Sequence, residues 1–147
     1  MRVLVTGADG FVGRHLCRFL EDGGDVVIPL YGSPNPDVSP SRGAHRIDVR
    51  DAVAVRDAFA ETKPDAVIHL AAVSSIVQSD AEPAMTFQVN AEGALNVCLA
   101  AKALETPPRV LLVSSGEVYG PTAPGHDAAE QAPFAPTSPY AAAKIAA

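Results

Sequence analysis

The feature that most constrains this chain is a short apolar run that leads into three glycines spaced three residues apart. Residues 3–5 are apolar without polar alternation, which is typical of a strand buried on both faces of a parallel sheet. In Gly7, Gly10 and Gly13, one glycine would permit a sharp turn, one would let backbone approach a diphosphate, and one would let the next helix press on the strand. N–H groups at the helix start would then face the anion.

Apolar residues continue at helical spacing directly after these glycines. They are Phe11, Val12, Leu16, Phe19 and Leu20. Gly23 and Gly24 then mark the helix end. The segment therefore predicts a strand, a turn and a helix that bind a dinucleotide, and the alternative is an ordinary glycine-rich turn.

Length and charge set broad limits on the function. The 147 residues, 48% of them hydrophobic, suit one globular domain with a sizeable core. The net charge of -6 and the scattered lysines and arginines remove the usual basis for binding nucleic acid or anionic membranes. Without a long apolar segment or a signal peptide at Arg2, a cytoplasmic protein is expected. Cys17 and Cys98 are expected to be buried free thiols, and no metal site is predicted.

Strand and helix patterns alternate along the chain. Strands are predicted at residues 25–31, 45–49, 66–70 and 109–113, and helices at 53–59, at 83–104 and from 138 onward. Loops are predicted at 32–43 and in the proline-rich stretch that ends at 137. Within the 83–104 helix one face would carry Phe87, Ala91, Ala94, Leu95 and Cys98. The alternation predicts a doubly wound α/β domain with a parallel sheet over residues 1–147.

Ligands of such sheets bind beyond the carboxyl ends of the strands. Asp48, followed by Val49, stands where a carboxylate could accept from an adenine amino group, although a turn or helix-terminal aspartate is an equal alternative. After the next strand, small residues would let a flat cofactor lie against the backbone: Leu70, Ala71, Ala72, Val73, Ser74 and Ser75. His69 is expected to be a hydrogen-bonded core histidine, because no carboxylate or cysteine neighbours it.

Ser115, Tyr140 and Lys144 form the set that suggests catalysis. Tyr140 and Lys144 are four residues apart and would share a helix face, with Cβ atoms about 5–6 Å apart. An ammonium near a phenol lowers the phenol's pKa toward the range useful for proton transfer, and a serine hydroxyl can hold the substrate oxygen. The alternative is an alanine-rich helix packed closely for structural reasons. Only the combination with the glycine turn favours catalysis strongly.

Six motifs together resemble the extended short-chain dehydrogenase/reductase family, and within it the nucleotide-sugar epimerases, dehydratases and reductases. The motifs are TGADGFVG from residue 6, DV from 48, HLAA from 69, VNAEGALNV from 89, SSGEVYG from 114 and SPYAAAK from 138. The resemblance covers essentially the whole chain. Through HLAAVSSIVQS and Glu117, the chain looks most like the GDP-mannose 4,6-dehydratases and the GDP-6-deoxy-4-keto-mannose reductases.

The resemblance implies a Rossmann domain, an NAD or NADP cofactor and a nucleotide-sugar substrate. The implied cofactor-binding residues are Gly7, Gly10, Phe11, Val12, Gly13, Asp48, Val49, Leu70, Ala71, Ala72, Asn90, Tyr140 and Lys144, with Asn90 structural in the site. The implied catalytic residues are Ser115, Glu117, Tyr140 and Lys144, and the implied substrate-binding residues are Ser74, Ser75, Ser115, Glu117 and Tyr140. It also implies a homodimer through the 83–104 helix and the helix from 138.

Two departures from the family pattern matter. Family members are roughly twice as long, so the last strands and the substrate domain are expected beyond residue 147, and the isolated chain is expected to be inactive. No acidic residue ends the second strand at Leu30, Tyr31 and Gly32, which slightly favours NADP over NAD.

The predicted function is reversible oxidation of a sugar hydroxyl by a 4,6-dehydratase or a related epimerase or reductase. Glu117 would remove the proton beside a 4-ketone, unless it is a solvated loop glutamate. The alternative function is a non-catalytic Rossmann module that senses NAD(P)H.

Overall fold

The computed structural model describes residues 1–32, 45–123 and 125–147. Nearly all of the loop predicted at 32–43 lies outside the described residues. Five parallel strands form one sheet in the order β3-β2-β1-β4-β5. The strands are β1 (Arg2–Thr6), β2 (Val26–Tyr31), β3 (His45–Arg46), β4 (Ala66–His69) and β5 (Arg109–Leu112).

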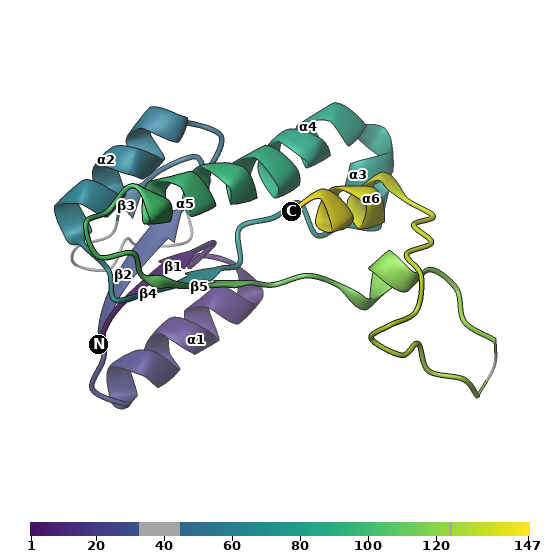
Figure 1. Ribbon diagram of the computed structural model, residues 1–147, viewed down its shortest axis with the longest axis horizontal. Coiled ribbons are helices and arrows are strands. Elements are labelled where there is room, and N and C mark those ends of the chain that lie inside the picture. Colours follow the sequence, from purple (N-terminus) through teal and green to yellow (C-terminus); the bar gives the residue numbers. More distant parts are fainter. Residues whose placement is uncertain (33–44, 124) are drawn as a thin grey trace.

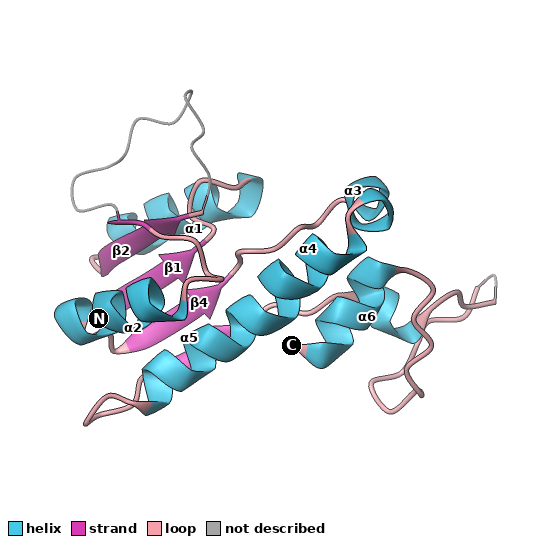
Figure 2. Cartoon of the chain, turned by 90° about the horizontal axis from the view of Figure 1, so that it is seen from above, coloured by secondary structure: helices cyan, strands magenta, loops and turns pink. Residues whose placement is uncertain are grey.

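Helices cover both faces of this sheet. Helix α1 (Phe11–Asp22) lies on one side, and α2 (Ala52–Thr62) and α5 (Gly93–Lys102) lie on the other (Figures 1 and 2). The smaller elements are α3 (Ile76–Ala81), α4 (Pro83–Phe87), the π-helical turn η1 (Gln88–Glu92), the 3-10 helix η2 (Gly116–Tyr119) and α6 (Pro139–Ala146). The doubly wound parallel α/β fold is therefore confirmed.

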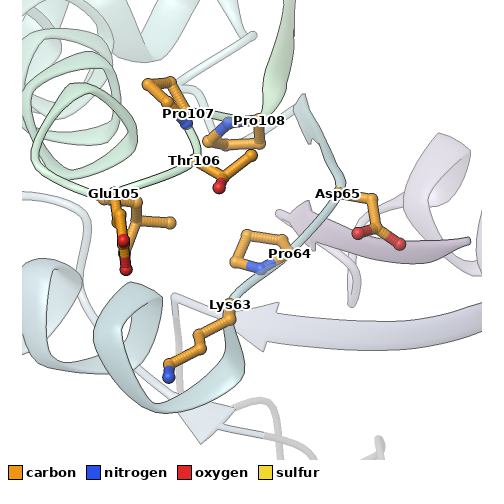
Figure 3. A pocket seen from close by; sticks show the side chains of 8 residues that line it. Lys63, Pro64, Asp65, Glu105, Thr106, Pro107 and Pro108 are labelled. Carbon is orange, nitrogen blue, oxygen red and sulfur yellow. The ribbon is translucent and has the colours of Figure 1, made fainter.

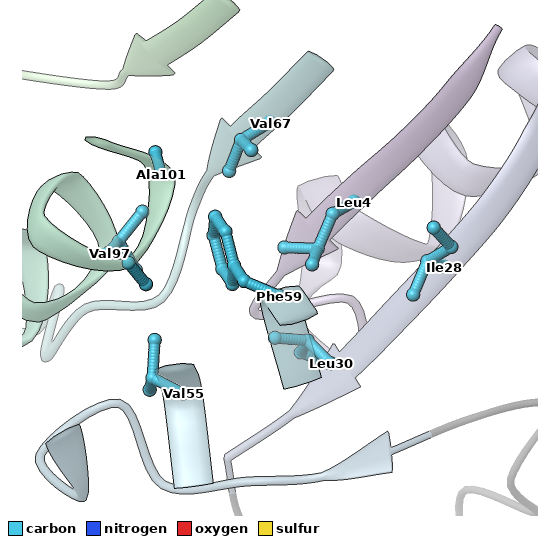
Figure 4. Close-up of a cluster of buried hydrophobic side chains, with 9 residues drawn as sticks. Leu4, Ile28, Leu30, Val55, Phe59, Val67, Val97 and Ala101 are labelled. Atoms are coloured by element: carbon cyan, nitrogen blue, oxygen red, sulfur yellow. The ribbon is translucent and has the colours of Figure 1, made fainter. Parts of the chain in front are cut away.

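Strand β1 separates two hydrophobic cores. Leu4 points into the core under α2 and α5, where the fully buried Phe59 ring lies between the sheet and Val97 (Figure 4). Val3 and Val5 point to the opposite core, under α1. All three β1 side chains are at most 1% exposed, which confirms a strand buried on both faces.

Helix α1 contacts the sheet through only part of its apolar sequence. Leu16, Cys17 and Leu20 pack against the core under α1. Phe11 and Phe19, by contrast, are 76% and 73% exposed. Cys17 and Cys98 are free thiols, as predicted. They are half-buried, although the prediction was that they would be buried.

Pro29 lies inside β2 and does not end it. Along β2, the Leu30 carbonyl accepts from the Ala8 N–H on the β1 side, and the Tyr31 carbonyl accepts from the Ile47 N–H on the β3 side. Because alternate residues of a strand bond to opposite neighbours, the missing N–H of Pro29 would face the β3 side. Among the described residues, pairing with β3 begins at Leu30 and His45, one residue after Pro29.

The third strand is shorter than the predicted 45–49. After Arg46 only the Ile47 N–H still bonds to β2, at the Tyr31 carbonyl. The Asp51 N–H then donates to the Asp48 carbonyl and closes a turn, so the chain leaves the sheet. Strands β4 and β5 each end one residue earlier than predicted.

The predicted 83–104 helix contains a π-helical turn, η1. The buried Asn90 side chain pairs with the Val73 backbone, accepting from its N–H at 2.8 Å and donating to its carbonyl at 3.1 Å. The extra residue of a π-turn rotates the following helix face. On the predicted apolar face Ala94 is buried, whereas Phe87 and Leu95 are 40% and 56% exposed.

Helix α3 was not predicted by the sequence pattern. Ser75 caps it, since its hydroxyl accepts from the Gln78 N–H at 3.2 Å. In the part of the chain that the structure describes, no helix is long and apolar enough to span a membrane.

Candidate functional site

A cleft of about 620 Å³ lies at the carboxyl ends of the central strands. It gathers most of the residues that the sequence singled out: Gly7, Gly10, Phe11, Val12, Gly13, Asp48, Val49, Leu70, Ala71, Ala72, Ser74, Tyr140 and Lys144. Four predicted site residues do not line it: Ser75, Asn90, Ser115 and Glu117. The position at the strand ends is where parallel sheets bind ligands.

The glycine turn needs its glycines for steric reasons. Gly7 has φ +66, and a Cβ there would lie 2.8 Å from the Ala71 nitrogen. A Cβ on Gly13 would lie 2.2 Å from the Gly7 carbonyl oxygen, so this glycine lets α1 approach the turn. The α1 N-terminus has no side-chain cap, which leaves its first N–H groups for an anion.

The wall opposite this turn is the segment that follows β4. Thr6, at the end of β1, is fully buried, and its hydroxyl accepts from the N–H groups of Leu70 and Ala71 at 3.2 and 3.1 Å. The Asn90 side-chain amide binds the backbone of Val73, which is another residue of this wall. Asn90 therefore contacts the wall from outside the cleft.

Asp48 is paired with Arg50 at the rim of the cleft. The Arg50 Nη2 lies 2.6 Å from Oδ2 of Asp48, and the Arg50 Nε lies 3.0 Å from both carboxylate oxygens. This hydrogen-bonded guanidinium lowers the pKa of Asp48 below its ordinary value. Arg50 also lines the cleft and was missed, although it stands only two residues from Asp48.

Tyr140 and Lys144 enter the cleft from α6. Ser138 caps this helix by accepting from the Ala141 N–H at 3.1 Å, and Pro139 occupies its first turn. The Lys144 ammonium donates to the Val113 carbonyl at 2.7 Å, and burial lowers the pKa of Lys144. Among the described residues, the Tyr140 hydroxyl has no hydrogen-bond partner and stays available to a ligand.

Ser115 directly precedes η2, and Glu117 lies within it; neither residue lines the cleft. The Ser115 hydroxyl accepts from the Glu117 N–H at 3.2 Å and so caps the short helix. Glu117 is exposed. The cleft itself is lined by the preceding residue, Ser114.

A second cavity, of about 330 Å³, lies at the opposite end of the strands, beside the amino-terminal ends of β4 and β5. Its walls are the turns before these strands, with Lys63, Asp65 and Glu105 among the side chains (Figure 3). No predicted site residue lines this cavity. The cleft at the carboxyl ends of the strands is therefore the candidate active site.

Comparison with known proteins agrees with this geometry. The chain is 38% identical over 150 residues to the GDP-6-deoxy-D-mannose reductase of Pseudomonas aeruginosa, covering 99% of this chain and 44% of that protein. The structure of the Thermus thermophilus UDP-glucose 4-epimerase complex with NAD superposes with a TM-score of 0.90 at 37% identity, covering 99% of this chain and 48% of that one.

A solved structure with the other cofactor is also similar. RMD from Pseudomonas aeruginosa, complexed with NADPH, has a TM-score of 0.78 at 36% identity, and the match covers 99% of this chain and 45% of that one. The chain thus spans about half the length of the relatives that it matches. The profile of the NAD dependent epimerase/dehydratase family matches residues 3–147. The chain therefore belongs to the NAD dependent epimerase/dehydratase family.

Proposed function

We propose that this chain supplies the dinucleotide site and the proton-transfer residues of an NAD(P)-dependent enzyme that acts on nucleotide sugars. The observation that carries the proposal is that Tyr140 and Lys144 line the same cleft as the glycine turn. The reaction is reversible oxidation of a sugar hydroxyl, within a 4,6-dehydratase or a related epimerase or reductase. The relatives described above include a reductase and an epimerase.

The cleft fits a dinucleotide along its length. The uncapped start of α1 offers N–H groups to the diphosphate, and the space that a Cβ on Gly7 or Gly13 would fill is taken up by backbone. Asp48 and Val49 would hold the adenine, and Lys144 would hold the nicotinamide ribose. A bound NAD(P) would supply reversible hydride transfer with the sugar carbon.

Tyr140 is the proposed proton-transfer residue. Its phenol oxygen, once it has released its own proton to solvent, would accept the proton of the sugar hydroxyl as oxidation proceeds and would return that proton in the reverse step. Lys144, held by Val113, stands one helical turn after Tyr140 and lines the same cleft, so it would place its positive charge on the same side of the site. Ser115, directly before η2, would hold the sugar oxygen from the side of the cleft.

Glu117 supports the dehydratase as the specific reaction. It is exposed in η2, two residues after Ser115. Once the sugar carries a ketone at position four, the proton on the neighbouring carbon is acidic. A carboxylate beside it could remove this proton and pass it to the hydroxyl at position six, which leaves as water. The hydride taken at position four would then return to position six, and a solvent proton would add at position five. Ser74 lines the cleft and would contact the sugar, and Ser75 would act through its cap on α3.

NADP is the proposed cofactor over NAD, and the cytoplasm is the proposed compartment. Strand β2 ends at Tyr31, and Gly32 follows on the cleft, so neither residue offers a carboxylate to the adenosine ribose. A carboxylate there would favour the free 2′-hydroxyl of NAD over the phosphate of NADP.

A homodimer is proposed through the outer face of the α4 to α5 segment and through α6. Phe87, Leu95 and Leu99 are 40%, 56% and 55% exposed on this segment and offer apolar surface to a partner. A second copy would bury them. Sedimentation velocity should show a dimer that Leu95→Glu dissociates, whereas Val53→Glu, on the equally exposed outer side of α2, should leave it intact.

The proposed function is tested first by dinucleotide binding and then by turnover. The chain should bind NADPH, seen as a change in nicotinamide fluorescence, and Gly13→Val should abolish the binding. The natural protein should convert a nucleotide hexose. A natural protein that binds NADPH but turns over no nucleotide sugar would support the non-catalytic sensor instead.

A further inference from the structure

His69 and Thr6 form a buried polar pair between the ends of two neighbouring strands. They are register partners on β4 and β1, and they are 4% and 0% exposed. The Nδ1 atom of His69 lies 2.7 Å from the Thr6 hydroxyl oxygen. Neither side chain lines the cleft, so the pair acts on the site only through its neighbours.

The hydrogen bonds around Thr6 determine which nitrogen of His69 carries the proton. The Thr6 hydroxyl oxygen accepts from the Ala71 N–H at 3.1 Å and from the Leu70 N–H at 3.2 Å, and the Leu70 N–H is shared with the Thr6 carbonyl. A hydroxyl has two acceptor positions and one proton. With both positions in use, the Thr6 proton points to Nδ1 of His69. Nδ1 is therefore the acceptor and Nε2 carries the ring proton.

The surroundings of His69 favour this neutral ring. Burial, together with the charge of Lys144, lowers the pKa of His69 to about 4. Within the described residues, the buried Nε2 has no hydrogen-bond partner. Among the described residues, the ring is therefore hydrogen-bonded through Nδ1 alone, and Thr6 is the residue whose position it can fix.

The Thr6 hydroxyl binds the wall of the cleft where the wall comes close to the glycine turn. Leu70 and Ala71 are lining residues, and a Cβ on Gly7 would lie 2.8 Å from the Ala71 nitrogen. A small rotation of this wall would therefore either close on the glycine turn or open away from it. The orientation of the Thr6 hydroxyl therefore affects the direction of the Leu70 and Ala71 N–H groups.

We propose that His69 is a positioning residue for the dinucleotide. By accepting the Thr6 proton, it keeps the hydroxyl lone pairs turned to Leu70 and Ala71, and so fixes the wall against the glycine turn. This inference rests on the proposed function in one respect, namely that the cleft binds a dinucleotide. It assigns His69 no contact with the cofactor and no proton transfer.

Variants at position 69 separate this role from simple packing. His69→Asn places an acceptor oxygen at the position of Nδ1, although it is smaller than histidine. His69→Phe fills the space of the ring but offers no acceptor. Thr6→Val removes the hydroxyl and keeps the shape. If Nδ1 matters, the smaller Asn variant should bind NADPH more tightly than the better-filling Phe variant.

The experiment measures NADPH dissociation constants by fluorescence in the natural protein, with near-UV circular dichroism to confirm folding. His69→Asn should stay within about threefold of wild type, whereas His69→Phe and Thr6→Val should each weaken binding by roughly tenfold or more. The double variant His69→Phe with Thr6→Val should be no weaker than either single variant, because both break one contact. Wild-type affinity in a folded His69→Phe variant, or additive losses in the double variant, would overturn the proposal.

A second measurement needs no variant. Long-range proton–nitrogen NMR of the histidine rings should show His69 protonated at Nε2 and not at Nδ1 near neutral pH. A proton on Nδ1 refutes the positioning role by itself. If the wild-type protein binds no dinucleotide, the proposed function itself is wrong. If it binds NADPH but the variants or the NMR spectrum give the contrary result, only the positioning role of His69 is wrong.

Discussion

The Lys144 ammonium and the Val113 backbone carbonyl are joined by a 2.7 Å hydrogen bond, which ties α6 to the chain just beyond β5. Lys144 is therefore anchored to the sheet and does not swing freely over the cleft. Burial removes part of the hydration of the ammonium and so lowers the pKa of Lys144, which makes a fixed acceptor such as the Val113 carbonyl more valuable to it. The bond aligns the two elements that carry the proposed catalytic residues.

Replacing Lys144 should therefore harm both cofactor binding and turnover. Lys144→Met keeps the length of the side chain and removes the charge and the bond to Val113. We expect a loss of about tenfold or more in NADPH affinity, measured by fluorescence titration, since a hydrogen bond to a charged group is worth roughly 1.5–3 kcal/mol. Lys102→Met is the control, because this lysine is exposed in the last turn of α5, outside the cleft. Equal affinities for the two variants would contradict the assigned role.

Tyr140 should matter for chemistry and little for binding. Tyr140→Phe removes one hydroxyl that has no partner among the described residues, so the fold should not change. The rate of the hydride-transfer step in the natural protein, followed by single-turnover absorbance of the nicotinamide, should fall by about 10² or more. Tyr119→Phe is the matched control, since that hydroxyl donates to the Glu130 carbonyl at 3.3 Å outside the cleft. Lost NADPH binding with unaltered turnover per bound site would mark Tyr140 as structural.

His69 should make stability depend on pH. Its pKa is about 4 in the folded chain and near 6.5 in the unfolded chain, so the unfolded state binds more protons between these values. The unfolding free energy is then highest above pH 6.5 and falls as the pH drops toward 4. The difference between the two pKa values corresponds to roughly 3 kcal/mol at most. Lys144 is the charged group that adds to the effect of burial.

Urea unfolding at a series of pH values measures this dependence. A folded His69→Asn variant should lose most of the slope between pH 6.5 and 4, because asparagine does not titrate. His15→Asn provides the control, since His15 is exposed on α1. Parallel slopes for wild type and His69→Asn would show that His69 does not carry the effect.

The sequence predicts those parts of the site that depend on local chain geometry. The glycine turn follows from backbone sterics within one strand–turn–helix unit, and the Tyr140 to Lys144 spacing follows from the helix repeat. Both meet in the cleft because parallel strands place their carboxyl ends at one edge of the sheet. The motif pattern also predicts the family, and the match of the family profile to residues 3–147 confirms it.

Features set by contacts between distant residues were not predictable in this way. The π-turn depends on Asn90 reaching Val73, 17 residues away in sequence. The tautomer of His69 depends on Thr6, 63 residues away. Helix α3 has only six residues, too few to show a helical repeat. Each of these features needs the folded neighbours to be known first.

Glu117 carries the most specific part of the proposed reaction. Its carboxylate is exposed in η2, and its own N–H donates to Ser115 at 3.2 Å, so the backbone is fixed while the side chain is free to reach a bound sugar. In a dehydratase the removal of the proton at position five precedes the loss of water from position six. The natural protein should therefore convert GDP-mannose or another nucleotide hexose to the 4-keto-6-deoxy product, and in deuterated water it should place deuterium at position five.

Glu117→Gln should suppress both product formation and deuterium entry by about 10² or more, because the amide cannot accept the proton. Oxidation at position four should persist, seen as a burst of reduced nicotinamide, since Tyr140 is untouched. Glu105→Gln, an exposed glutamate beside the second cavity at the opposite end of the strands, is the matched control. If Glu117→Gln forms product and exchanges deuterium at the wild-type rate, Glu117 is a solvated loop residue and the dehydratase assignment loses its base. A burst without any deuterium entry in the wild-type protein would instead favour an epimerase, which needs no base at this position.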